Sequence, residues 1–527
     1  MLRGVAGGLV PACLAGCAAG AAGAPVDAGP DRTAPRQDSG IDTGLFGDVR
    51  VALPPDARLG TGDGGAQDAA DGAVLVAPTS ARDRIGVYAW GFDTTAWPGA
   101  PDRLNWAASK VSGLGGRTIR VYLGPQDIYR VLPPGDAGAF DLATAAASPA
   151  YATLFANPSF DTYLLTTYSV GDNVDNWSDG FTAAEATTEQ QQISSLGTYL
   201  LRAYPTKTFI LLNWEGDNAI AQYASNGVAY GGFTDWIQAR SAGVQAARAG
   251  VGGNAKLYSG VELNLLRNLT TGAPCDTASN PCIVSEVVPK VTVDYFSYSS
   301  WQSLGAGETP ALVAATLQAD LTTALGWAKQ GTPTATPARF IVGEFGAPRE
   351  EEDLGECAAM FRTAAVIPAI TGWGASYGIF WQVIDNVPSP STLVLGYGLY
   401  KASGPASLSA TLFQTLYSTG VPTVPATPNC PTISQGGIVD AINFMSTDID
   451  PTTIISIFGT SFTDAGDIIH VREAAEQWNI DGGPDFYESP TQMNATLPNV
   501  GASQPALVYV TDGDGVDSNG QVINVQP

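Results

Sequence analysis

Beyond residue 84 the chain alternates short apolar runs with longer segments of mixed polarity. Each run holds about four to eight residues, many of them β-branched or aromatic, a pattern typical of buried strands. Successive runs begin roughly 30 to 50 residues apart, the spacing of repeated strand–loop–helix units in a parallel barrel. The predicted strands are Ile85–Trp90, Thr118–Leu123, Tyr163–Tyr168, Thr208–Asn213, Leu257–Leu263, Val291–Tyr298, Phe340–Gly343 and Tyr377–Trp381.

The segments between these runs predict helices. Thr182 is a suitable N-cap for a helix over Ala184–Tyr204, and apolar residues recur at i, i+3 and i+4 in Phe233–Ala249 and Thr309–Lys329. Ser407–Ser418 would form the last helix. The pattern therefore predicts the α/β fold class, a (β/α)8 TIM barrel spanning residues 84–420. An open, doubly wound sheet is the alternative.

A second domain is predicted after the barrel. Pro and Thr crowd residues 421–432, which indicates a linker. Short β-type runs follow at Ile454–Gly459, Ile468–Val471, Gln492–Leu497 and Ala506–Thr511, and predict a small all-β sandwich over residues 433–527. The stretch IISIFGTSF and the closing segment resemble the immunoglobulin-like TIG-type modules of bacterial surface proteins, which implies spacing, adhesion or carbohydrate contact.

The amino-terminal segment has the features of an export signal. Residues 1–17 combine Arg3 with a short apolar stretch and small residues. Leu14-Ala15-Gly16-Cys17 resembles the lipobox of bacterial lipoproteins, which implies a lipid anchor on Cys17; an ordinary cleavable signal is the alternative. Residues 18–83 are rich in Ala, Gly, Asp and Pro and predict a disordered tether. We expect an outer-membrane or cell-surface lipoprotein, or a secreted protein, that acts as a monomer.

Composition narrows the chemistry. The formal net charge of the 527-residue chain is −25, so phosphate backbones are repelled and nucleic acid is an unsuitable partner. The single histidine, His470, belongs to the predicted second domain. A barrel without histidine can hold neither a Ser-His-Asp triad nor a His-ligated zinc ion, so its acid–base chemistry falls chiefly to carboxyl groups.

Four cysteines follow the amino-terminal segment. Cys275 and Cys282 bracket a polar loop that a disulfide could close, and Cys357 and Cys430 remain as a second pair. In an exported protein, thiols favour disulfides over metal ligation.

Two glutamates stand at the ends of predicted strands. Glu215 ends the fourth strand, in TFILLNWEGDN, and Glu344 ends the seventh, in ARFIVGEFGAP. The carboxyl ends of all barrel strands open on one mouth, so both carboxyl groups can face a single site. Such a pair suits glycosidic bond cleavage, in which one group is a proton donor and the other stays ionised. Asp217 is a rival acid, and Glu262 on the fifth strand is a secondary candidate.

The segment Val342-Gly343-Glu344-Phe345-Gly346 resembles the Gly-Glu-Phe/Trp-Gly pattern of clan A retaining glycoside hydrolases, which include the family 5 cellulases and mannanases. The resemblance covers the whole barrel as architecture but only a few residues as motif. It implies that Glu344 is the nucleophile and Glu215 the acid/base, with no metal or organic cofactor. That group carries Asn directly before its acid/base. Here Trp214 stands there and Asn213 lies one position earlier.

Further residues have roles that the same resemblance implies. Arg120 would hydrogen-bond the nucleophile, and so could Tyr298. Trp381 would stack on a sugar ring. Aromatic faces suit the C–H faces of pyranose rings, so aromatic residues at strand ends are further substrate-contact candidates, although each could simply pack. These are Trp90, Trp97, Trp177, Trp214 and Trp301, with Asn213 as a polar contact. The run Glu350–Asp353 is interpreted as a solvated loop, with a calcium site as the alternative.

The sequence thus predicts an exported glycoside hydrolase that cleaves β-linked poly- or oligosaccharide with retention of configuration. A surface protein that binds carbohydrate without turnover is the alternative, and the Asn-Trp-Glu order favours it. A transglycosylase would use the same residues.

Overall fold

The computed structural model describes residues 75–525 except for 76 and a set of short segments. These segments are 91–101, 133–139, 170–176, 222–226, 253–254, 305–308, 350–354, 386–395, 402–403, 425–429, 442–448, 450–451, 463–466, 474–475, 481–486, 499–504 and 513–515. The predicted signal, most of the predicted tether, Trp97 and Glu350–Asp353 lie outside the described residues.

Eight parallel strands close into a barrel in chain order, which excludes the open sheet. The strands are β1 (Ile85–Tyr88), β2 (Thr118–Leu123), β3 (Thr162–Thr167), β4 (Thr208–Leu212), β5 (Leu257–Leu263), β6 (Tyr295–Ser299), β7 (Phe340–Phe345) and β8 (Tyr377–Phe380). Every predicted barrel strand is present, two of them with the predicted bounds. Val291, predicted as the start of the sixth strand, precedes β6 by four residues. The fold class α/β with a (β/α)8 barrel is therefore confirmed.

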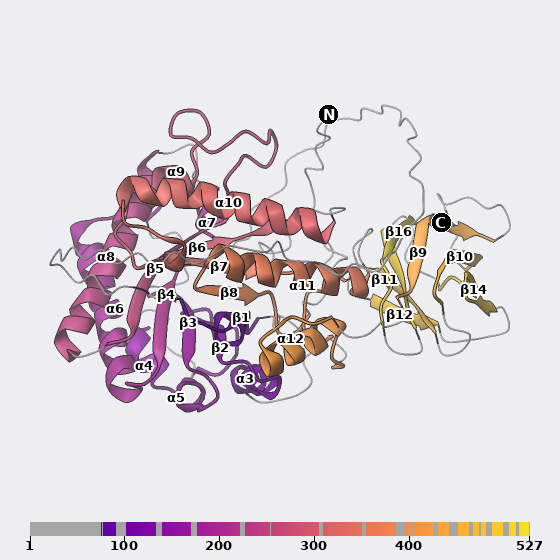
Figure 1. The fold of residues 1–527 in the computed structure, drawn as a ribbon, viewed down its shortest axis with the longest axis horizontal. Helices are drawn as coiled ribbons and strands as arrows, with labels where there is room; N and C mark the ends of the chain where they lie inside the picture. Colours follow the sequence, from indigo (N-terminus) through magenta and orange to yellow (C-terminus); the bar gives the residue numbers. More distant parts are fainter. Residues whose placement is uncertain are drawn as a thin grey trace. The chain divides into compact units, whose positions relative to one another are not determined.

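Helices surround the barrel, and Figure 1 shows the long helices α6, α8 and α10 on the outside of its strands. The helices of the barrel are α2 (Ala81–Arg84), α3 (Arg103–Gly113), α4 (Leu142–Ala146), α5 (Pro149–Ala156), α6 (Ala183–Ala203), α7 (Gly216–Ile220), α8 (Gly227–Val251), α9 (Ile283–Glu286), α10 (Pro310–Gly331), α11 (Glu356–Trp373) and α12 (Leu408–Thr419). Short 3-10 turns cover Val288–Lys290, Trp301–Ser303 and Pro337–Arg339.

Local signals in the sequence explain where these helices begin and end. Thr182 and Glu185 form a capping box at the start of α6, and the Thr309 side chain accepts from the Leu312 amide at the start of α10. Helices α11 and α12 end at Gly374 and Gly420, both with left-handed backbone that glycine adopts without strain.

Apolar side chains fill the barrel and the layer between its strands and helices. The interior cluster takes one residue or more from six strands, because alternate residues of a strand face inward. It includes Tyr88, Leu164, Ile210, Leu212, Tyr295, Ile341, Tyr377 and Ile379. A filled interior confines open space to the ends of the barrel, where the loops are.

The carboxy-terminal part is all-β, with two four-stranded antiparallel sheets. One sheet has the order β13 (Tyr487–Ser489), β14 (Gln492–Thr496), β10 (Ile454–Thr460), β9 (Thr432–Asp440); the other has β12 (Glu476–Ile480), β11 (Ile468–Glu473), β15 (Pro505–Thr511), β16 (Gln521–Asn524). Their apolar faces share one cluster, which contains Ile457 and Met493 from the first sheet and Val471 and Val508 from the second. His470 lies on β11, outside the barrel as expected.

Both expected disulfides are present. Cys275–Cys282 closes the loop after β5, and Cys357–Cys430 joins α11 to the chain just before β9. Among the described residues, no helix is both long and apolar enough to cross a membrane.

Candidate active site

Glu215 and Glu344 meet at the carboxyl end of the barrel. Glu344 is the next-to-last residue of β7, and Glu215 follows β4 as the N-cap residue of α7. The Nε1–H of Trp301 donates to Oε1 of Glu215 at 2.9 Å and to Oε2 of Glu344 at 3.1 Å. Because both oxygens contact one nitrogen, they are at most about 6 Å apart. One N–H thus joins the two carboxyl groups.

The backbone at Glu215 leaves the strand. Strand β4 ends at Leu212, and Glu215 has φ +27° and ψ 72°, a left-handed conformation that is strained for a residue with a side chain. The regular alternation that would send Asn213 and Glu215 to one side therefore does not continue to this point. The side-chain amide of Asn218, in the first turn of α7, donates to Oε2 of Glu215.

Asn213 and Tyr298 make their contacts within the protein. The Asn213 side chain accepts from the Glu262 amide at 2.7 Å and donates to the Glu262 carbonyl at 3.0 Å, and it is fully buried. The Tyr298 hydroxyl is 3.1 Å from the Ser303 hydroxyl. The hydrogen bond to Glu344 that Tyr298 could have supplied comes from Trp301, one turn further along the chain.

Arg120 lies beneath the carboxyl pair and is fully buried. Its guanidinium makes two hydrogen bonds of 2.8 Å to Glu262, one to each carboxylate oxygen. Its Nη1 is also 3.6 Å from Oε1 of Glu344, an ion-pair distance longer than a hydrogen bond. Among the described residues that Glu344 oxygen has no hydrogen-bond partner. Arg120 therefore faces Glu344 as expected, but Glu262 is its main partner.

The electrostatics of the pair follow from burial. Burial first, and the negative charge of Glu262 second, raise the pKa of Glu215 to about 7. Burial and the charge of Glu215 raise the pKa of Glu344 well above its usual value, while Arg120 acts in the opposite direction. Two carboxyl groups this close lose their protons in succession rather than together. Arg120 favours the charged form of Glu344, although burial and the charge of Glu215 have the larger effect on its pKa.

Asp217, the rival acid, has a different role. Its carboxylate accepts from the main-chain amides of Asn264 at 2.9 Å, Leu265 at 3.0 Å and Ile283 at 2.7 Å. These bonds join α7 to the segment after β5 and to the first residue of α9. Burial raises the pKa of Asp217 to about 6, although the amide bonds lower it. Both oxygens of Asp217 accept hydrogen bonds from main-chain N–H groups, so this carboxyl group holds neighbouring segments together.

Aromatic side chains stand beside the pair. The ring of Trp381 is 6.4 Å from Trp301 and 5.7 Å from Trp90, and Trp301 is 5.6 Å from Tyr397. Trp381 is buried, whereas Trp90, Trp214 and Trp301 are partly exposed. Trp177 is fully buried and packs 4.9 Å from Phe233, so it belongs to the core.

Two glycines explain the Gly-Glu-Phe-Gly segment in steric terms. A Cβ at Gly343 would lie 2.1 Å from Oε2 of Glu262, and a Cβ at Gly346 would lie 2.6 Å from the carbonyl oxygen of Trp381. Both contacts are shorter than real side chains allow. Gly343 therefore leaves room for the Glu262 side chain, and Gly346 lets the chain after β7 pass close to the main chain just after β8.

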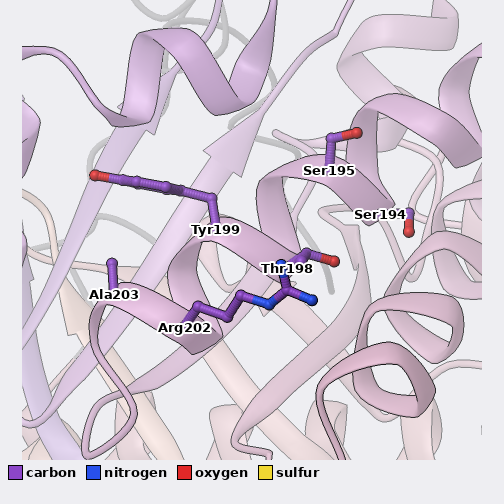
Figure 2. Close-up of a pocket in the computed structure, with 6 residues that line it drawn as sticks. All are labelled: Ser194, Ser195, Thr198, Tyr199, Arg202 and Ala203. Atoms are coloured by element: carbon purple, nitrogen blue, oxygen red, sulfur yellow. The ribbon is translucent and has the colours of Figure 1, made fainter.

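A hollow elsewhere on the barrel does not belong to this site. Figure 2 shows the side chains that line it on the last turns of α6: Ser194, Ser195, Thr198, Tyr199, Arg202 and Ala203. Helix α6 ends shortly before β4 begins, so these turns lie toward the amino end of the strand. Glu215 follows the opposite end. Among the described residues, no group of three or more His, Cys, Asp or Glu side chains could hold a metal ion.

Comparisons with known proteins find similarity to solved structures. No family model and no curated protein match the sequence. A β-glucuronidase 2 structure from Bacteroides uniformis matches at a TM-score of 0.41 and 10% identity, covering 84% of this chain and 46% of that one. The chain thus spans less than half of that protein's length.

Two further solved structures are similar to the same degree. An endo-β-1,4-mannanase from Thermotoga petrophila matches at a TM-score of 0.41 and 11% identity, covering 84% of this chain and 97% of that one. A GH5_18 protein from Bifidobacterium longum subsp. infantis matches at 0.41 and 14%, covering 66% and 81%. Similarity of this degree assigns no function, so the chemistry has to be argued from the side chains.

Proposed function

We propose that this protein is an exported glycoside hydrolase that cleaves β-linked poly- or oligosaccharide with retention of configuration. The observation that carries the proposal is the indole N–H shared by Glu215 and Glu344. It limits the two oxygens that it binds to a separation of at most about 6 Å, which is compatible with the 5–5.5 Å between the carboxyl groups of retaining enzymes. The Gly-Glu-Phe-Gly segment supports a place in clan A, near family 5.

In this mechanism Glu344 is the nucleophile. Its Oε1 has no hydrogen-bond partner among the described residues and lies 3.6 Å from Arg120. It attacks the anomeric carbon while Glu215 transfers its proton to the leaving oxygen, and the glycosidic bond breaks. Glu215 then takes a proton from water, whose oxygen displaces Glu344 from the glycosyl-enzyme. Each proton that Glu215 gives is returned, so the enzyme ends the cycle unchanged.

The charge distribution supports these two roles. The acid must hold a proton near neutral pH, and burial with the Glu262 charge raises the pKa of Glu215 to about 7. The nucleophile must be ionised: burial and the charge of Glu215 raise the pKa of Glu344, and Arg120 is the group that favours its charged form. Exchanging the two roles would put the proton on the carboxyl group nearest the cation, which costs electrostatic energy.

The substrate would bind on the partly exposed aromatic residues. Trp90, Trp214 and Trp301 can stack on sugar rings, and Trp381 packs against Trp90 and Trp301. Trp301 would then have two functions, since its ring would contact the sugar and its N–H donates to both carboxyl groups. Asn213, Arg120 and Tyr298 act behind this surface, through their contacts with Glu262, Glu344 and Ser303.

We also propose that the protein is exported through its amino-terminal segment and anchored by a lipid on Cys17. The two disulfides support an oxidising compartment, where such bonds persist. The two antiparallel sheets that share an apolar core support an immunoglobulin-like module at residues 433–527. Incorporation of labelled fatty acid, lost in Cys17→Ala, tests the anchor.

The function is tested by screening the purified protein against β-linked glucans, mannans, xylans and galactans and against aryl β-glycosides. Glu344→Gln should abolish hydrolysis with the fold intact, because the amide is no nucleophile. Glu286→Gln is the matched control, since that carboxylate pairs with Lys290 at 2.9 Å on the outside of the barrel. Hydrolysis that persists in Glu344→Gln would move the nucleophile elsewhere.

The second candidate is a protein that binds carbohydrate without turnover. The near-complete burial of Glu215 and Glu344, 1% and 0% exposed, favours it, because a sugar ring reaches them only after surrounding side chains move. Binding in the same screen, with no reducing sugar released by the unmodified protein, would establish this candidate and exclude the hydrolase.

A further inference from the structure

Glu262 is a third buried carboxylate at the site, and the mechanism above gives it no step. It lies on β5, next to β4 in the barrel, and is fully buried. Besides Arg120, its carboxylate accepts from the Ser297 hydroxyl at 2.7 Å and from the Glu215 amide at 3.1 Å. The four hydrogen bonds come from β2, β6 and the start of α7, so this one side chain joins three elements.

The surrounding chain is shaped to hold that carboxylate. The Asn213 side chain accepts a hydrogen bond from the main-chain N–H of Glu262 and donates one to the main-chain carbonyl of Glu262. Gly343 leaves the space that Oε2 occupies, since a Cβ there would lie 2.1 Å from that oxygen. Ser297 is the neighbour of Glu262 in the β5–β6 register. A carboxylate held from every side does not shift its position when the site is occupied.

The contact with Glu215 concerns its backbone rather than its side chain. Glu215 has φ +27°, a conformation that costs free energy, on the order of 1–3 kcal/mol for a residue with a side chain. The amide that this conformation turns inward donates to Oε1 of Glu262. A charge-assisted hydrogen bond of this kind offsets the strain. The direction in which the Glu215 side chain leaves the backbone therefore depends on Glu262.

We propose that Glu262 is a positioning residue for the reaction: it holds the strained main chain of Glu215 and the guanidinium of Arg120 in their working places. The inference rests on the proposed function, because it concerns the same carboxyl pair. Glu262 does not touch the reacting atoms. It acts on the proton donor through the Glu215 amide and on the nucleophile through Arg120.

The charge of Glu262 has a measurable consequence. The titratable and charged side chains of the described residues that face it are Arg120 from β2, Glu215 before α7, Glu344 from β7 and, across the Arg120 guanidinium, Tyr88 from β1. With glutamine at 262 the Glu215 proton is held less tightly. The positive charge of Arg120, no longer shared with Glu262, falls more fully on Glu344. The pKa values of both groups of the pair should fall.

The experiment compares Glu262→Gln and Glu262→Asp with the unmodified protein in the pH dependence of kcat/KM. For Glu262→Gln we expect kcat to fall at least tenfold. The acidic and the alkaline limb of the kcat/KM profile, which report the two ionisations of the carboxyl pair, should both move to lower pH by about one unit. Glu262→Asp keeps the charge, but its shorter side chain places the carboxylate farther from its donors. We therefore expect kcat to fall while both limbs of the pH profile stay in place.

Glu189→Gln is the matched control. Glu189 is also buried and pairs with an arginine, Arg240, at 2.9 Å, but on α6 and α8. It should lower stability without moving either limb. If the limbs of Glu262→Gln stay in place and its kcat matches that of Glu189→Gln, Glu262 is only a structural residue and the inference is overturned.

Two further measurements cover the remaining outcomes. If Glu262→Gln does not fold, Ser297→Ala, which removes one donor to Glu262, must lower kcat severalfold; an unchanged kcat overturns the inference. If the unmodified protein hydrolyses nothing, the proposed function fails, and the inference is tested on the Trp301 indole resonance in [15N]tryptophan-labelled protein. Its titration midpoint should fall by about one pH unit in Glu262→Gln, and an unmoved midpoint contradicts the inference.

Discussion

Glu215 and Glu344 share one hydrogen-bond donor. The Trp301 indole N–H lies 2.9 Å from the first carboxyl group and 3.1 Å from the second, so a single rigid ring fixes both. A tryptophan side chain has two rotatable bonds, and its ring is held by Trp381 and Tyr397. The geometry of the pair is thereby set before any substrate arrives, which is the preorganisation that acid–base catalysis requires.

The first prediction concerns this donor. Trp301→Phe keeps an aromatic ring but removes the N–H. That hydrogen bond lowers the pKa of both Glu215 and Glu344, because it favours their charged forms. Its loss should therefore move both limbs of the kcat/KM profile to higher pH, opposite to the shift expected for Glu262→Gln. We expect kcat to fall about tenfold to hundredfold.

The control for that variant is Trp327→Phe on α10, which removes an indole away from the site. It should leave the profile unchanged. If Trp301→Phe moved the limbs to lower pH, or changed only KM, the shared N–H would have no part in setting the charges of the pair.

The second prediction concerns stability and pH. The pKa of Glu215 is about 7 in the folded protein against an ordinary value of 4.5. A raised carboxyl pKa contributes stability at pH values below the ordinary one, and that contribution is lost as the pH rises through 7. Glu215→Gln carries no charge, so it should be more stable than the unmodified protein at pH 8, by about 1–3 kcal/mol, and similar at pH 4.

Denaturant unfolding at the two pH values measures this difference. If the difference in unfolding free energy between Glu215→Gln and the unmodified protein were the same at pH 4 and pH 8, ionisation of Glu215 would not destabilise the folded protein. That result would contradict the prediction.

The third prediction concerns Gly343. Alanine at this position would force its methyl group against Glu262 and Ser297, whose atoms lie 2.1 and 2.3 Å from the Cβ site. Gly343→Ala should lower the free energy of unfolding by about 2 kcal/mol or more and reduce kcat, because Glu262 has to move. Gly372→Ala on α11, where the Cβ meets nothing within 4 Å, should instead be neutral or stabilising by up to about 1 kcal/mol. If Gly343→Ala kept the stability and the kcat of the unmodified protein, the space around Glu262 would accommodate a methyl group and the prediction would be wrong.

The fourth prediction compares the disulfides. The bridged residues are separated by 73 positions in Cys357–Cys430 and by 7 in Cys275–Cys282. A longer loop loses more chain entropy on closure, so the Cys357→Ser/Cys430→Ser pair should cost about 4 kcal/mol and the Cys275→Ser/Cys282→Ser pair about 2 kcal/mol. Equilibrium unfolding of the two double variants measures the order, and a larger loss for the short loop would contradict the entropic account.

The strands of the barrel could be predicted because buried strands appear in the sequence as short runs of apolar residues. β2 and β5 have the predicted bounds, since each is a continuous run with polar residues or turns on both sides. β6 starts later than predicted, because Val288–Lys290 forms a 3-10 turn and the apolar residues after it pack without pairing. β9 was not predicted, since its middle, Ser434 to Gly437, lacks an apolar pattern.

Both glutamates could be predicted to lie at the carboxyl end of the barrel, although Glu215 follows β4 by three residues, but the contacts between them could not be predicted. Arg120 and Tyr298 are the hydrogen-bond donors to Glu344 that the sequence predicts. The β6–β7 pairing shifts register after Tyr298, and Trp301 lies on the 3-10 turn that follows. The positive φ of Glu215 gives no sequence signal, because a glutamate is not a residue expected there. Glu262 stands out only as a lone charge in an apolar strand.

The configuration of the first product tests the central claim most directly. The 1H NMR spectrum of a β-glycoside hydrolysed by the unmodified protein shows, within the first minutes, which anomer is released before mutarotation mixes the two. A double displacement on Glu344 with Glu215 as acid/base predicts the β-anomer and no product from Glu344→Gln. Release of the α-anomer would mean direct attack by water and would contradict the assignment of Glu344 as nucleophile.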